Sequence, residues 1–182
     1  MDSAFAWIGQ ITEWLGRFIP RRMILDTTEA AIKYKHGAEP VLCGPGVWWY
    51  WPWSSTWVAY PTARQTDRLE TQTMQTSDGK TFIVSGTLTH EVSDLTLLIP
   101  RTHSPMTTIV DIAMAAVHDV LCEMTWEELQ AEQRRGTIKT KLRNEAQKQL
   151  HDYGIKVIKL QLNSIAPARV LKVCQSVSNE EN

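Results

Sequence analysis

The sequence has few cysteines, almost no net charge and no long apolar run, and each shortage argues against a class of protein. Its three cysteines, Cys43, Cys122 and Cys174, form no CxxC pair, so neither a disulfide framework nor a zinc site is indicated. A net charge of −1 over 182 residues provides no basic field for nucleic acid. The motifs HExxH, GxSxG and GxGxxG do not occur. We therefore expect no enzyme, no cofactor, no metal site and no nucleic-acid partner.

Tryptophan, in contrast, is abundant. Hydrophobic residues make up 43% of the chain, an ordinary share for a folded protein, but five of the eight tryptophans lie within ten residues. The indole ring joins a large apolar body to one polar N–H, so tryptophan favours boundaries between apolar material and water. The cluster therefore predicts an interface with a membrane or with a protein. Its members are Trp48, Trp49, Trp51, Trp53 and Trp57.

The N-terminal segment, residues 1–22, has the pattern of an amphipathic helix. Its apolar residues recur at the i, i+3, i+4, i+7 spacing of one helix face, and Pro20 ends the pattern. Arg17, Arg21 and Arg22 follow at its exit. The residues expected to contact a membrane here are Trp7, Ile8, Ile11, Trp14, Leu15, Phe18 and Ile19.

Three interpretations of this segment compete. A transmembrane span needs about 20 apolar residues, whereas this run is shorter and is interrupted by Gln10 and Glu13. A secretory signal begins with a basic region, but Asp2 is acidic and no small-residue cleavage site follows. A helix lying in the plane of the membrane interface fits best, because bulky aromatic residues occupy one face. Packing on the protein or on a neighbouring subunit, and a short tilted span, stay open as alternatives.

The rest of the chain predicts an α+β fold. Strands are expected over residues 23–35, in the tryptophan-rich stretch and over 64–76 and 80–92, and a last strand over 155–165. Between them, two helices are expected over 104–121 and 125–151, the second opening on a capping box. Strands, then helices, then a strand give an α+β arrangement of two packed subdomains over residues 23–173, followed by a polar tail, 174–182.

Several short motifs follow one another in an order that resembles the stomatin/prohibitin/flotillin family, known as SPFH or Band 7. A Gly-Pro-Gly turn leads into an aromatic segment ending in proline, residues 44–52, and a T-x-D-G turn occupies Thr76–Gly79. A T-x-E-E-L helix entry follows at Thr125–Leu129, and a Y-G-I-x-V exit at Tyr153–Val157. Each motif is weak alone, but their order across residues 20–170 is specific.

This resemblance implies an SPFH domain with an N-terminal membrane-associating helix. It further implies a membrane-associated, homo-oligomeric scaffold that assembles into a ring or cage. Such a scaffold organises a membrane patch or corrals partner membrane proteins, such as membrane proteases in the family's prokaryotic branches. Many members continue into a long coiled-coil stalk, whereas this chain stops at Asn182, so assembly is expected through the domain itself.

Two sets of residues carry this functional hypothesis. Beside the N-terminal segment, Trp48, Trp49, Trp51 and Trp53 are expected to contact the membrane, with the body on the cytoplasmic side because arginines follow the apolar segment. The alternative is a monomeric lipid- or partner-binding module built on the same tryptophans. Alternating charges on the 125–151 helix make candidate contacts between subunits, namely Glu128, Glu132, Arg134, Arg135, Lys139, Lys141 and Arg143.

One pair of residues has a spacing compatible with catalysis. His118 and Cys122 lie at i and i+4 of a predicted helix and could share a face for metal or nucleophilic chemistry. The sequence indicates no third group to activate or orient them. A buried histidine and cysteine in an apolar helix is therefore the expected arrangement, and Cys43 is expected to be a small core residue.

Overall fold

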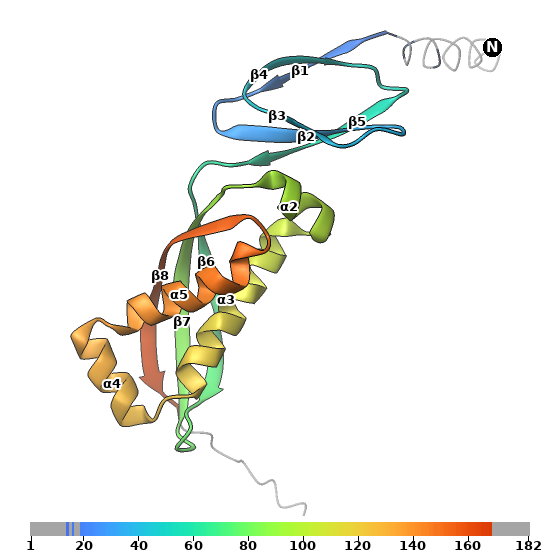
Figure 1. Cartoon of the computed structure of the whole chain (residues 1–182). Coiled ribbons are helices and arrows are strands. Elements are labelled where there is room, and N and C mark those ends of the chain that lie inside the picture. Colours follow the sequence, from blue (N-terminus) through green and yellow to red (C-terminus); the bar gives the residue numbers. More distant parts are fainter. Residues whose placement is uncertain (1–13, 15, 17–18, 169–182) are drawn as a thin grey trace, which may run out of the picture.

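The computed structural model describes residues 14, 16 and 19–168, which form two bodies placed end to end (Figure 1). The first body is built from strands β1 (Arg21–Leu25), β2 (Glu29–Lys35), β3 (Val41–Cys43), β4 (Gly46–Tyr50) and β5 (Ser55–Pro61). The second contains strands β6 (Gln65–Gln75), β7 (Thr81–Val92) and β8 (Ile155–Pro167). Its helices are α2 (Leu95–Arg101), α3 (Pro105–Cys122), α4 (Trp126–Arg135) and α5 (Ile138–His151). Mixed strands and helices confirm the α+β class.

The first body is a small two-layer structure. Strands β1 and β4 pair antiparallel as a ribbon, and β3, β2 and β5 form a sheet in that order. The two layers enclose a small core of four buried side chains, and Cys43, 1% exposed, is one of them, as expected. The core residues are Met23, Leu25, Ala31 and Cys43.

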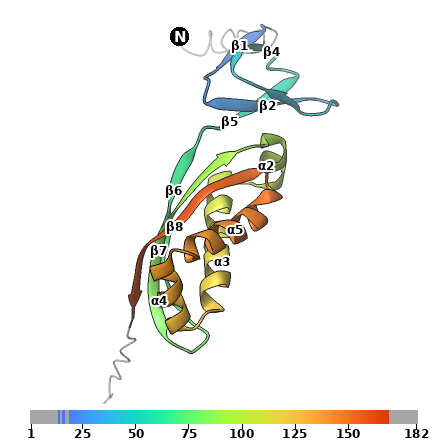
Figure 2. The ribbon, with the colours of Figure 1, turned by 60° about the vertical axis from the view of Figure 1, so that its left-hand side comes forward.

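The second body is a three-stranded antiparallel sheet, β6-β7-β8, with helices α3 and α5 along one face (Figures 1 and 2). Strand β7 alternates as the sequence predicts, with Phe82, Val84, Leu88 and Val92 buried against the helices. Helix α3 is long and apolar enough to span a membrane by length and composition, the one such helix in the described part of the chain. Six of its side chains nevertheless belong to the core, as expected of a central helix in a folded domain.

Three local predictions differ from the structure. The predicted strand 23–35 is two strands, because the turn at residues 26–28 folds β2 back beneath β1. The predicted helix 125–151 is broken at Gly136, whose left-handed backbone (φ 76°) ends α4. Helix α2 was not predicted, since its core side chains, Leu95 and Leu98, are too few to show a helical period.

Two of the motifs that are far apart in sequence meet at the far end of the second body. The carboxylate of Asp78, in the β6–β7 turn, accepts a hydrogen bond from the Trp126 backbone N–H at 3.2 Å, and the Ser77 N–H donates to the Met124 carbonyl at 3.1 Å. Thr125 and Glu128 form the expected capping box beside it. Hydrogen bonds to the Asp78 carboxylate lower its pKa, first the one from the Thr76 hydroxyl and then those from Lys80 and the Trp126 backbone, because they favour the charged form at the positive end of α4.

The two bodies share packing at their junction. Ile32 of β2 is fully buried and belongs to the core of the second body, with Tyr34 and Tyr60 packed around it. Helix α2 lies beside this sheet (Figure 1). The first body is thus held at one end of an elongated molecule, and strand β8 runs toward the other end (Figure 2).

Candidate membrane interface

Exposed apolar side chains gather on the first body. The described residues include 14 large hydrophobic side chains that are exposed, and 12 of them lie between Trp14 and Val58. Only Ile83 and Met106 belong to the second body. Since scattered exposed apolar residues are normal but contiguous ones mark interaction surfaces, the first body is where a partner surface is expected.

The core of this cluster is the outer side of the β1–β4 ribbon. Met23 and Leu25 point inward, so the alternate residues of β1 face outward, and the antiparallel register places Arg22 opposite Trp49 and Ile24 opposite Val47. Ile24, Val47 and Trp49 are 61%, 60% and 62% exposed. We name this side, Arg22, Ile24, Val47 and Trp49, the ribbon face. It is an apolar surface with one cation, a composition suited to the interface of a lipid bilayer.

The turn that follows β4 extends this surface. Trp51 and Trp53 are 47% and 58% exposed there, and the Trp51 carbonyl accepts the N–H groups of Ser54 and Ser55 at 3.1 and 2.9 Å. Lys33 of β2 also donates its ammonium group to the Trp49 carbonyl at 3.0 Å, which ties the ribbon to the sheet below. The backbone that carries Trp49 and Trp51 is therefore held by hydrogen bonds.

The tryptophans named by the sequence do not all face the same way. Trp48 lies opposite the buried Met23, on the inner side of the ribbon, and its indole N–H donates to the Gly44 carbonyl at 2.8 Å. Trp57 packs edge-on against Tyr50, with ring centroids 6.3 Å apart. Ile24 and Val47 were missed. The alternation in residues 21–25 was visible, but only the β1–β4 pairing shows that these side chains join Trp49.

The predicted N-terminal membrane contacts, Trp7, Ile8, Ile11, Leu15 and Phe18, lie outside the described residues. Trp14 and Ile19 are described and are 58% and 62% exposed. The register pairs Arg21 with Tyr50, so the chain enters β1 at the same end of the ribbon that carries the tryptophan turn. The start of β1 and the tryptophan turn thus lie at the same end of the first body.

The candidate subunit contacts divide into two groups. Lys141 pairs with Glu132, the Arg143 guanidinium donates to the Val157 carbonyl at 3.3 Å, and Glu128 completes the capping box. These four residues already have roles within the chain. Within the described ranges, Arg134, Arg135 and Lys139 are exposed and have no ion-pair partner. Their charges remain available to a neighbouring molecule.

The pair His118 and Cys122 does not form a buried couple, contrary to expectation. The His118 side chain is 60% exposed and lies 3.8 Å from the adjacent Asp119 carboxylate, while Cys122 is half-buried. The core side chains of α3 leave His118 facing solvent, whereas Cys122 packs partly against the core. Among residues 14, 16 and 19–168, no three His, Cys, Asp or Glu side chains cluster in a way that could hold a metal ion.

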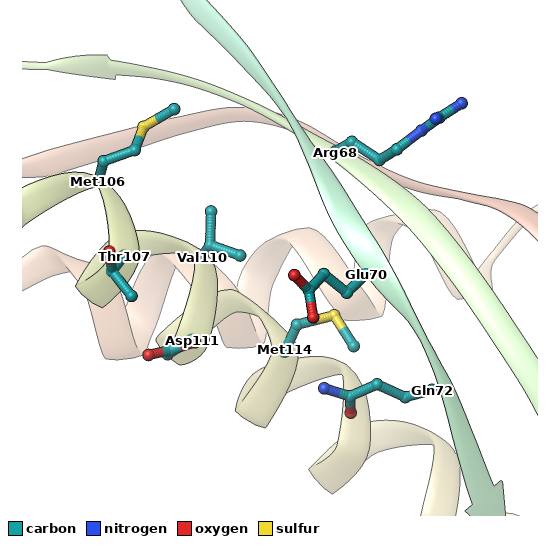
Figure 3. A pocket seen from close by; sticks show the side chains of 8 residues that line it. All are labelled: Arg68, Glu70, Gln72, Met106, Thr107, Val110, Asp111 and Met114. Carbon is teal, nitrogen blue, oxygen red and sulfur yellow. The ribbon is translucent and has the colours of Figure 1, made fainter.

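A cavity of about 320 Å³ lies between the edge strand β6 and helix α3 (Figure 3). Met106, Val110 and Met114 form its apolar side, and Figure 3 shows Glu70 and Gln72 turned toward the helix while Arg68 points away. Thr107 and Asp111 also line the groove, and the Thr107 hydroxyl is hydrogen-bonded to the Ser104 hydroxyl at 2.9 Å. The groove therefore shows no nucleophile hydrogen-bonded to a base.

An α+β protein that exposes aromatic and aliphatic side chains at one end belongs to the class of proteins that associate with surfaces or partners through that end. The family model described as "SPFH domain / Band 7 family" matches residues 23–181, and the chain belongs to this family. A comparison with curated proteins found no match. SPFH domains are typical of membrane-associated scaffold proteins that self-oligomerise and are generally not enzymes.

Proposed function

We propose that this chain is a membrane-associated scaffold whose first body rests on the bilayer through the ribbon face and the tryptophan turn. The N-terminal segment, residues 1–22, adds a second anchor at the same end. Two weak anchors on each subunit, repeated across a homo-oligomeric ring or cage, give stable attachment through avidity. Such an assembly would organise a membrane patch or corral partner membrane proteins, a membrane protease among them.

The distribution of exposed apolar side chains carries this proposal. Twelve of the 14 lie in one end of the molecule, and the ribbon face sets Ile24, Val47 and Trp49 side by side. The second body, with two such side chains, has no comparable surface among the described residues. Arg21 and Arg22 follow the apolar residues of the N-terminal segment, which supports placing the body on the cytoplasmic side.

Two features support lateral self-association. The sheet β6-β7-β8 leaves β6 and β8 as edge strands, whose unpaired backbone groups can pair with another chain. Arg134, Arg135 and Lys139 add exposed cations on and beside α4. A heterologous contact of this kind, repeated by rotation, closes into a ring.

Vesicle flotation of the full chain tests the membrane contact. The variant Ile24→Ser/Val47→Ser/Trp49→Ser removes three side chains that are each about 60% exposed, so it should cost little stability. Full burial of such a side chain contributes about 1.5–3 kcal/mol, and only the exposed part, about 60% of each, is left to bury. The three changes together should therefore weaken partitioning by at least about 3 kcal/mol, roughly 100-fold or more.

A matched control is Ile83→Ser/Met106→Ser, which removes the two exposed apolar side chains of the second body. It should float like the wild type. Equal flotation of the ribbon-face variant and the wild type would show that the ribbon face does not contact lipid.

The alternative function, a monomeric lipid- or partner-binding module, uses the same exposed tryptophans. Negative-stain imaging of protein extracted from membranes in mild detergent separates the two. Closed rings or cages support the scaffold, whereas uniform monomers that still float with vesicles support the single module.

A further inference from the structure

A second cavity, of about 450 Å³, opens at the tryptophan-turn end of the first body. It lies where β2 and the start of β5 meet the turn after β4, and its lining combines cations, hydroxyl groups and indole rings. The lining residues are Lys33, Lys35, Trp51, Trp53, Ser54 and Ser55. The ribbon face and the second body contribute nothing to it, so it is a separate feature from both.

The two lysines stand side by side in this cavity. Lys33 and Lys35 are two residues apart on one face of β2, which puts their Cα atoms roughly 7 Å apart. The Lys33 ammonium donates one hydrogen bond, to the Trp49 carbonyl, and has further N–H groups to offer. In the described part of the chain neither lysine has a carboxylate partner. The cavity therefore has two uncompensated positive charges.

Few negative charges of the first body lie near the two lysines. Three carboxylates occur in residues 19–61, and two of them, Asp26 and Glu29, lie at the opposite end of the first body. Only Glu39, in the turn after β2, shares the end that carries the cavity. Arg21 opens β1 at this same end, because the register pairs it with Tyr50.

The polar groups between the lysines and the tryptophans complete a site for an oxyanion. Ser55 pairs with Lys35 across the β2–β5 register and is 5% exposed, and Ser54 precedes it in the turn. Ammonium and hydroxyl groups are hydrogen-bond donors to phosphate oxygens. Trp51 and Trp53 border the same cavity with apolar rings, which suit the glycerol and upper acyl region of a lipid.

We propose that this cavity binds the phosphate of an anionic phospholipid headgroup, with Lys33 and Lys35 as its cationic donors. The proposal rests on the membrane association proposed above and specifies the lipid that the first body selects. When the tryptophan turn enters the interface, the cavity lies at the depth of the headgroup phosphates, and the two lysines face them. The ribbon face supplies attachment to any bilayer, and the cavity supplies the preference for negative lipid.

Flotation of the full chain with two vesicle types tests the site. One type is phosphatidylcholine alone and the other replaces a third of it with phosphatidylglycerol of the same acyl chains. The wild type should prefer the anionic vesicles. Lys35→Gln, which keeps the Lys33 hydrogen bond to Trp49, should lower binding to them about 5-fold, equivalent to about 1 kcal/mol for one lysine, and leave binding to phosphatidylcholine unchanged. Lys33→Gln/Lys35→Gln should lower binding to the anionic vesicles about 30-fold, equivalent to about 2 kcal/mol.

A matched control separates a site from diffuse attraction. Lys148→Gln/Lys159→Gln removes the same charge from exposed positions on α5 and β8, and it should keep the anionic preference. An equal loss in both double variants would overturn the proposed site. The single change Lys35→Gln, at an exposed side chain without a described partner, covers the case in which the double variant fails to fold.

Two further measurements separate a lipid headgroup from free phosphate, and the headgroup site from membrane association itself. Inorganic phosphate or glycerol 3-phosphate in millimolar excess should leave vesicle binding intact. Displacement by either, together with its binding to lipid-free protein, would assign the cavity to a free phosphate and overturn the lipid source. Absence of binding to both vesicle types would refute the membrane association itself, whereas equal binding to both would refute only the headgroup site.

Discussion

Gly154 offers the sharpest test of how the second body is held together. It follows α5 with φ at 70°, and its carbonyl accepts the backbone N–H groups of Ser93 and Asp94 at 2.9 and 3.0 Å. A Cβ atom at this position would lie 2.3 Å from the Asp94 carbonyl oxygen and 2.9 Å from the Asp94 Cβ. Glycine is therefore required twice, for its backbone conformation and for the close approach of another chain segment.

The two requirements can be separated with a second glycine. Gly136 has φ at 76°, but an added Cβ there meets nothing within 4 Å. Gly136→Ala should therefore cost only the left-handed strain, about 1 kcal/mol. Gly154→Ala carries the same strain and must also push back the backbone around Asp94, so we expect a loss of at least about 3 kcal/mol, a large part of a stability of roughly 5–15 kcal/mol.

The assays are urea denaturation and thermal unfolding of both variants, each monitored by circular dichroism. For a domain of this size, 1 kcal/mol shifts the melting temperature by about 2–4 °C, so Gly154→Ala should melt at least about 6 °C lower. Gly136→Ala should melt only a few degrees lower. Equal losses in the two variants would refute the reasoning, because the contact with Asp94 would then contribute nothing.

Two further predictions concern His90 and Thr125. His90 is fully buried, 3.3 Å from Asp67, and burial lowers its pKa despite that carboxylate. The unfolded chain therefore binds the proton more readily, and stability should decrease as the pH falls below about 6.5. The urea midpoint of the wild type should therefore be lower at pH 5.5 than at pH 7.5. His90→Gln should reduce this difference between the two midpoints, and an equal difference in the variant and the wild type would contradict the role of His90. Thr125→Ala removes the α4 cap and should lower the free energy of unfolding by about 1 kcal/mol in the same assay. Thr125→Ser should restore most of that loss. An unchanged urea midpoint in the alanine variant would show that the cap is dispensable.

Features that depend on a few adjacent residues could be predicted from the sequence. The capping box at Thr125, the turn at Asp78 and Gly79 and the alternation of β7 each depend on neighbours in sequence, and all three are present. The break at Gly136 was missed, because an isolated glycine in a helical pattern is tolerated as often as it ends the helix.

The sequence did not predict which side chains form the ribbon face. The tryptophan cluster indicated an interface, but a side chain's direction depends on which strand lies opposite. Pairing β1 with β4 placed Trp48 opposite the buried Met23, on the other side of the ribbon from Trp49, and joined Ile24 and Val47 to Trp49. The same holds for Lys33 and Lys35, whose cavity exists only because the turn after β4 folds over the end of β2.

The sequence alone thus determined the family, the α+β class, the interfacial composition of the first 60 residues and the absence of the common catalytic motifs, because these depend on residue types and short spacings. Tertiary structure decided on which side of the ribbon each tryptophan lies, how motifs 48 residues apart meet at Asp78 and Trp126, and where two lysines line a cavity with no carboxylate partner among the described residues. These features depend on strand register and on contacts between distant segments. A one-residue change in register would reverse the faces while leaving every local pattern unaltered.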